Sequence, residues 1–117
     1  MRLRDLQLDC YRTAKQKGFH DAHNMIPSDF ASVWISLGLI TSEVAEAMEE
    51  LRDLTTLDGQ LWHLGPNDKP EGLGSELADV VIRTLDLCGR LGLDLEEVME
   101  AKMAYNTSRP PLHGRTA

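Results

Sequence analysis

The stretch VWISLGLITSEVAEAMEELRDL, residues 33–54, decides the fold class of this chain. Apolar residues recur in it at alternating four- and three-residue steps, the period of one face of an α-helix. The members of this stripe are Val33, Leu37, Ile40, Val44, Ala47 and Leu51. Just before it, Ser28 or Asp29 is suited to cap the helix N-terminus. We therefore expect one long amphipathic helix from about residue 29 to about residue 54.

The same periodicity predicts three further helices. One covers residues 3–18, and another starts at Leu73 and ends at Gly89 or Gly92. Asp94-Leu-Glu-Glu has the pattern of a capping box, which opens a last helix that runs to about Asn106. Residues 55–72 form a loop rich in turn formers, and no alternating strand pattern is present. The expected architecture is a single all-α domain, residues 1–117, with a bundle of about four helices.

Composition narrows the class of protein. The chain has 117 residues, 12 basic and 19 acidic, with a net charge of −7. This acidic balance argues against non-specific binding to nucleic acid or to an anionic membrane surface. The longest uncharged run, residues 30–42, is too short to span a bilayer, and the N-terminus lacks the apolar segment of a signal peptide. Two cysteines cannot make a disulfide framework, so we expect a cytoplasmic protein.

Acidic residues follow the edge of two of these helices. Glu43, Glu46 and Glu50 lie within roughly 60° of one another around the first helix axis. Glu76 and Asp79 form a similar row on the helix that begins near residue 73. If the two apolar stripes pack together, these acidic edges converge at the rim of the core. Close carboxylates repel one another, so such a cluster is most stable in a folded protein when a bound cation offsets the repulsion.

The chemistry of that cluster favours a hard cation. Carboxylate oxygens select Mg²⁺ first, with Mn²⁺ as a possible substitute. Two such ions on four carboxylates, with positions left for water and phosphate, suit metal-assisted phosphoryl chemistry. The alternative is that both acidic rows only face water, which is common on surface helices.

The last helix and its tail supply the opposite charge. Lys102 and Asn106 share a face at i and i+4, and Arg109 lies just beyond. All three side chains are suitable donors to phosphate oxygens. The alternative is that Lys102 complements the C-terminal helix dipole and that Arg109 is an ordinary exposed cation.

Three stretches together resemble the MazG-like all-α nucleoside triphosphate pyrophosphohydrolases: residues 37–52, 76–86 and 102–115. They carry E-x-x-E, E-x-x-D and K-x-x-x-N-x-x-R-P ahead of His-Gly, and the resemblance covers roughly residues 30 to 115. It implies Mg²⁺-binding carboxylates at Glu43, Glu46, Glu76 and Asp79, and phosphate contacts at Lys102, Asn106 and Arg109. It also implies a homodimer or a dimer of dimers.

The resemblance implies hydrolysis of a nucleoside triphosphate to a monophosphate and pyrophosphate. Water would attack the α-phosphorus, and Glu46 or Glu50 would accept its proton as the catalytic base. Two other classes remain open. One is a non-catalytic helical dimerisation or interaction module, and the other is a degenerate family member that binds nucleotide without hydrolysing it.

Overall fold

The computed structural model describes residues 1–22, 29–57 and 59–111, and it confirms the all-α class. Helices account for most of these residues, and a two-stranded hairpin is the one sheet among them. In chain order the elements are α1 (Leu3–Gln16), α2 (Phe19–Ala22), α3 (Phe30–Asp53), β1 (His63–Leu64), the 3-10 turn η1 (Pro66–Asp68), β2 (Pro70–Glu71), α4 (Leu73–Leu91) and α5 (Leu95–Ser108).

The four expected helices correspond to α1, α3, α4 and α5, and their end signals act as expected. The carboxylate of Asp29 accepts a hydrogen bond from the backbone N–H of Ala31 at 2.9 Å. The left-handed conformation of Gly92 ends α4, and Asp94 caps α5. The alternative cap, Ser28, lies outside the described residues. Sequence periodicity missed α2 and the β1–β2 hairpin because four-residue helices and two-residue strands are too short to show a period.

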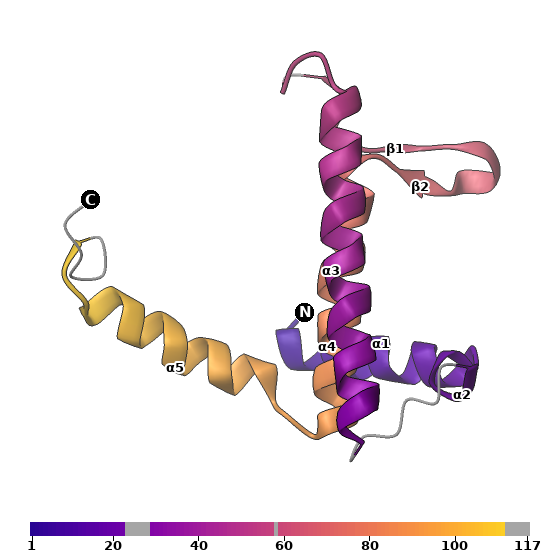
Figure 1. The fold of residues 1–117 in the computed structure, drawn as a ribbon. Helices are drawn as coiled ribbons and strands as arrows, with labels where there is room; N and C mark the ends of the chain where they lie inside the picture. The colour runs from indigo at the N-terminus through magenta and orange to yellow at the C-terminus, as the bar shows by residue number, and fades with distance from the viewer. Residues whose placement is uncertain (23–28, 58, 112–117) are drawn as a thin grey trace.

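Helices α3 and α4 run antiparallel and side by side, and α1 crosses α4 (Figure 1). The short helix α2 follows α1 and lies at its C-terminal end. Helix α5 turns away from this group and extends to one side (Figure 1). Within one chain the packed unit therefore consists of α1 to α4, and α5 does not join the expected four-helix bundle.

The face of α3 that α4 covers coincides with the expected apolar stripe only in part, at Ala47 and at the half-buried Val33 and Ile40. The buried residues of α3 are Ser32, Ser36, Glu43 and Ala47. Three members of the stripe, Leu37, Val44 and Leu51, keep 44–46% of their surface exposed. Small side chains let the two helices approach closely, and Arg90 of α4 donates hydrogen bonds to the hydroxyls of Ser32 and Ser36. Periodicity therefore predicted the pairing of these two helices, but it placed the buried face partly on Leu37, Val44 and Leu51, which stay exposed.

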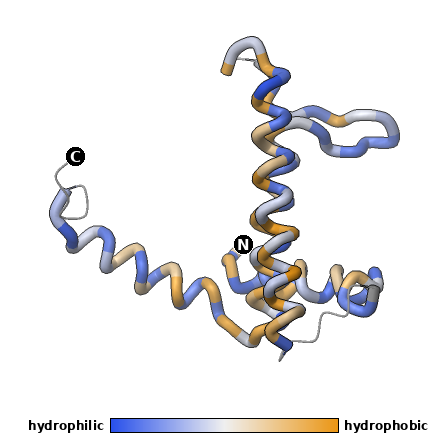
Figure 2. Tube along the Cα trace, in the orientation of Figure 1, coloured by the Kyte–Doolittle hydropathy of each residue, from blue (hydrophilic) through white to orange (hydrophobic). Residues whose placement is uncertain are grey.

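A single chain leaves an unusually large apolar surface in water. Apolar residues occur along all of α3 and α5 (Figure 2), and Phe30 and Trp34 are 85% and 73% exposed. The radius of gyration is 16.9 Å, against about 13 Å for a compact domain of this length. The accessible surface is 8768 Å², whereas a compact monomer of this size exposes about 6,400 Å². The single chain is therefore more extended than a compact domain and leaves apolar residues without a packing partner in the same chain.

Helix α3 is also the single helix, among the described residues, whose length and apolar composition would allow it to cross a membrane. The central helix of a soluble protein meets the same criterion. Here the helix packs along α4 and carries Glu43 and Glu46 in its middle.

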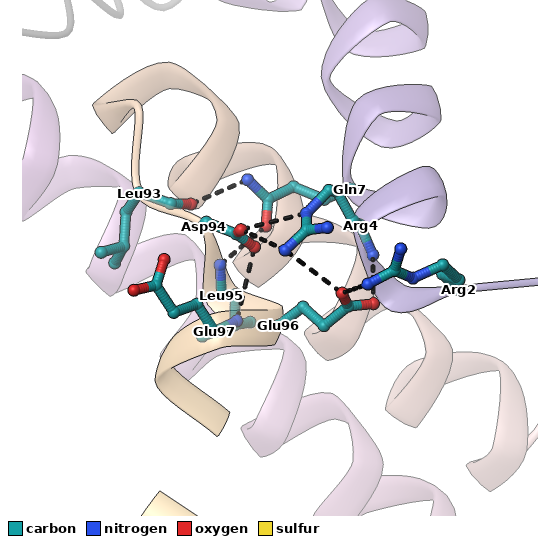
Figure 3. Close-up of polar contacts among 8 residues, drawn as sticks. All are labelled: Arg2, Arg4, Gln7, Leu93, Asp94, Leu95, Glu96 and Glu97. Carbon is teal, nitrogen blue, oxygen red and sulfur yellow. Dashed lines mark hydrogen bonds and ion pairs between the residues drawn. The ribbon is translucent and has the colours of Figure 1, made fainter. Parts of the chain in front are cut away.

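The start of α5 is held on α1 by ion pairs (Figure 3). The guanidinium of Arg4 donates to the carboxylate of Asp94 at 2.6 Å, and Arg2 pairs with Glu96. The amide of Gln7 bonds to backbone groups on both sides of Asp94. These contacts lie at the N-terminal turn of α5, where acidic side chains are also favoured by the helix dipole. The basic N-terminus therefore fixes where α5 leaves the bundle.

Two glycines give a matched test of this backbone. Gly92 has φ +67°, Gly38 lies inside α3, and nothing lies within 4 Å of where a Cβ would sit at either position. We expect Gly92→Ala to lower the free energy of unfolding by about 1–2 kcal/mol because of its left-handed backbone. Gly38→Ala is expected to raise it by about 0.5–1 kcal/mol through helix propensity. Urea unfolding at one fixed protein concentration measures both changes. If the two substitutions changed the free energy of unfolding in the same direction, the left-handed conformation of Gly92 or the helical conformation of Gly38 would be contradicted.

Candidate metal centre

Helices α3 and α4 bring three carboxylates to one point, as the two acidic rows predicted. One oxygen from each of Glu43, Glu46 and Glu76 lies within 4.8 Å of the others. We call these three residues the carboxylate cluster. Glu43 and Glu46 share a face of α3 because they are three residues apart, and Glu76 reaches them from the first turn of antiparallel α4. Burial differs within the cluster: only 9% of the Glu43 side chain is exposed, Glu76 is half-buried and Glu46 is exposed.

Hydrogen bonding leaves this cluster unsatisfied. Oε2 of Glu43 and Oε2 of Glu76 are buried and have no hydrogen-bond partner among the described residues. Ionised carboxylates only accept hydrogen bonds, so neighbouring carboxylates cannot satisfy one another unless they share a proton. A buried acceptor without a donor costs free energy, and a buried unpaired charge costs more. A proton or a cation at the cluster would supply the partner that the described protein groups do not.

The pKa values of the cluster express this competition for a proton. Burial, followed by the neighbouring carboxyls of Glu43 and Glu46, raises the pKa of Glu76 to about 7. The adjacent carboxyl of Glu43 raises the pKa of Glu46. Burial pushes the pKa of Glu43 upward, but Arg83 and hydrogen bonds within the cluster outweigh it and hold that pKa below its ordinary value. Without a bound cation, the cluster therefore loses its last proton only near neutral pH.

Arg83 is the basic partner of the cluster. Its Nε donates to Oε1 of Glu43 at 2.8 Å. Its guanidinium carbon also lies 5.1 Å from the centre of the Phe19 ring, within the range of a cation–π contact. Arg83 follows Glu76 and Asp79 along α4 at the spacing of one helix face.

The remaining two acidic candidates lie next to the cluster rather than in it. Asp79 lies about one turn along α4 from Glu76. Burial, and then the charge of Glu43, raises the pKa of Asp79. Glu50 is half-buried and continues the α3 row about one turn beyond Glu46. Among the described residues neither of them contributes an oxygen to the group of three.

A cavity of about 480 Å³ opens beside the cluster. Glu43 of α3 and Asp79 and Arg83 of α4 line it, and α1 contributes a further part of its wall. The lining residues from α1 and its C-cap are Asp9, Cys10, Thr13, Ala14 and Lys17, and α2 adds Phe19. No spacing in the sequence identifies this wall, because it becomes part of the site only when α1 crosses α4.

A buried polar network fixes α2 and α4 at this cavity. Nε2 of His20 lies 2.8 Å from Oδ1 of Asp86. Oδ2 of Asp86 lies 3.5 Å from Nε of Arg90, and Arg90 also bonds to the serines of α3. Buried polar groups that satisfy one another favour one packing over its alternatives. Sequence reasoning did not identify this network, since its members are scattered over three helices.

The three expected phosphate contacts lie elsewhere. Lys102, Asn106 and Arg109 are on α5 or directly after it, and α5 extends away from α3 and α4 (Figure 1). Nζ of Lys102 and the guanidinium of Arg109 lie 5.7 Å and 5.3 Å from the centre of the Tyr105 ring. One chain therefore groups two cations around Tyr105 and does not bring them to its own carboxylate cluster. The tail after residue 111 lies outside the described residues.

No family model, curated protein or solved structure matches this chain.

The pKa of Glu76 predicts a distinctive pH dependence. A carboxyl whose pKa rises on folding, here from 4.5 to about 7, destabilises the folded state progressively as pH rises through that interval. Glu76→Gln cannot ionise, so without metal the variant should gain stability relative to the parent between about pH 5 and about pH 8. Excess Mg²⁺ should stabilise the parent and not the variant, because ligand binding to the folded state raises stability. Thermal unfolding in chelator and in Mg²⁺ measures both effects, and a pH-independent difference in chelator would contradict the assignment.

Proposed function

We propose that this chain is a divalent-cation-dependent nucleoside triphosphate pyrophosphohydrolase that releases a nucleoside monophosphate and pyrophosphate. One observation carries the proposal. Three carboxylates from two helices converge with two buried oxygens that have no donor, and a ligand-sized cavity opens beside them. The motif resemblance supports the same reaction class.

The donor set of the cluster fits Mg²⁺, with Mn²⁺ as a substitute. All candidate ligand atoms are carboxylate oxygens, which hard cations prefer. Glu43, Glu46 and Glu76 would hold the cation, and Asp79 lies at the adjoining cavity wall as a further ligand. Bound there, the cation would supply Lewis-acid polarisation of phosphoryl oxygens and a more acidic water.

Side chains of the chain itself would bind the nucleotide and accept the proton of the attacking water. The α1–α4 cavity has the volume of a small-molecule site, about 300–1,000 Å³, and would receive the nucleotide beside Glu43. Glu46 is exposed at the edge of the cluster, and its raised pKa suits it to accept a proton from the attacking water. Glu50 is the second candidate for this base. The buried Glu43 is better suited to a ligand role, since Arg83 keeps it ionised.

A second copy of the chain completes this proposed enzyme. The excess exposed area, about 2,400 Å² over a compact monomer, is comparable to what an obligate homodimer buries per subunit. The exposed apolar side of α3, with Phe30 and Trp34, provides the matching contact surface. In the proposed homodimer, or dimer of dimers, α5 of one chain carries Lys102, Asn106 and Arg109 to the carboxylates of its partner.

Loss of one ligand or of the base should remove activity without unfolding the chain. We expect Glu46→Gln to lower Mg²⁺-dependent pyrophosphate release by about 100-fold or more, and Asp79→Asn to lower it as well. Glu49→Gln, on the exposed side of the same helix, is the matched control and should retain activity. A panel of ribo- and deoxyribonucleoside triphosphates provides the substrates. Unchanged release by both site variants would contradict the assignment.

Calorimetry with Mg²⁺ and a non-hydrolysable nucleotide distinguishes the competing classes. The proposed enzyme binds the nucleotide and hydrolyses its natural counterpart. A degenerate member binds without turnover, and an interaction module binds neither metal nor nucleotide.

Subunit mixing tests whether the two halves of the site come from different chains. Glu76→Gln removes a carboxylate and Lys102→Ala removes a cation, so each homodimer should be inactive. In a mixed dimer one site has both groups intact, and random mixing should restore about a quarter of the parent activity. The measurement is pyrophosphate release after the two variants are unfolded and refolded together. No recovery, with mixed dimers verified by mass, would contradict a site shared between Glu76 of one chain and Lys102 of the other.

A further inference from the structure

Arg83 carries a role that the proposed function does not require and that no motif assigns. Resting on that function, we propose that Arg83 is a positioning residue that a divalent cation displaces from Glu43. Without the cation, its guanidinium donates a hydrogen bond to Oε1 of Glu43. With the cation bound, the guanidinium is released into the adjoining cavity, where it pairs with the phosphates of the nucleotide.

The contacts of Arg83 place it between the cluster and the cavity. Its Nε donates to Oε1 of Glu43 at 2.8 Å, and its side chain lines the cavity with 29% of its surface exposed. An arginine side chain has five N–H donors. Among the described residues, the hydrogen bond to Glu43 uses Nε, and the terminal nitrogens make no hydrogen bond. The unused donors therefore belong to a group that already borders the proposed nucleotide site.

The electrostatics favour exchange over simultaneous binding. Through Nε, Arg83 satisfies one oxygen of Glu43 and leaves Oε2 of Glu43 and Oε2 of Glu76 without a donor. These two atoms are in side chains directed into the same cluster, and Glu43 is more than nine-tenths buried. A divalent cation binds several oxygens at once, whereas the guanidinium satisfies only one of them. Because the two positive groups repel at this distance, binding of either weakens binding of the other.

The aromatic ring of Phe19 would hold the guanidinium after its release from Glu43. The Phe19 ring, from α2, lies 5.1 Å from the guanidinium carbon and also lines the cavity. Contact with an aromatic face holds a guanidinium without using its N–H donors. Arginine presents those donors as a planar fork that matches phosphate oxygens, and lysine does not. The exchange thus moves a phosphate-binding group into position when the metal arrives.

Metal titration of the full chain without nucleotide tests the competition directly. We expect Arg83→Gln to bind Mn²⁺ about tenfold more tightly than the parent, since a charge-assisted hydrogen bond no longer opposes the metal. Its Mg²⁺-dependent turnover should nevertheless fall at least about tenfold. Arg83→Lys keeps the charge but not the fork, so it should bind Mn²⁺ nearly as the parent does and still lose turnover. Arg52→Gln, the same change of charge on an exposed part of α3, is the matched control and should leave both within about twofold.

The side-chain Nε–H resonance of Arg83 provides a second readout in the unmodified chain. It is assigned by its absence in Arg83→Lys, and it should shift as Mg²⁺ saturates because the bond to Glu43 is lost. Equal or weaker Mn²⁺ binding by folded Arg83→Gln, or an unchanged resonance at saturating Mg²⁺, would overturn the competition. Unchanged turnover in Arg83→Gln would overturn the phosphate contact. Failure of the parent chain to bind Mn²⁺ or Mg²⁺ at all would instead overturn the proposed function.

Discussion

The burial of Glu43 between α3 and α4 is the constraint on which the site depends. A carboxylate that is only 9% exposed must be compensated, and Arg83 compensates one of its oxygens at 2.8 Å. The other oxygen faces Glu46 and Glu76 without a donor. Among the described residues, two of the three buried side-chain atoms without a hydrogen-bond partner lie at this point; the third, Nε of Arg90, lies 3.5 Å from Oδ2 of Asp86. A local deficit of hydrogen-bond donors in an otherwise packed interface is the physical basis for expecting a cation there.

The N-terminal helices α1 and α2 line the cavity that opens next to the carboxylate cluster. Helix α1 crosses α4 and encloses the cavity beside Glu43, and α2 adds Phe19 next to Arg83. The contact between His20 and Asp86 ties α2 to α4, so the position of Phe19 depends on a buried polar network rather than on apolar packing alone. The basic residues Arg2 and Arg4 have a different task, since they fix the start of α5.

The open shape of one chain and the separation of its charges have a common explanation in the proposed homodimer. Helix α5 carries Lys102 and Arg109 away from the carboxylates of its own chain, while the apolar side of α3 remains exposed. A second copy would cover the apolar side and bring opposite charges together. The net charge of −7 would then be compatible with the proposed anionic substrate, because bound cations would neutralise part of the acidic middle of the chain.

The sequence by itself determined the all-α class, the four long helices, their caps and the acidic rows from which Glu43, Glu46 and Glu76 meet. These features are local: a helix period, a capping side chain and carboxylates spaced three residues apart depend on near neighbours along the chain. Only the tertiary structure decided that Ser32, Ser36 and Glu43, rather than Leu37 and Val44, face α4. It alone placed Arg83 on Glu43, built a cavity wall from α1, and left α5 outside the bundle. Those outcomes depend on which helices approach one another and how closely, and residues distant in sequence determine that together.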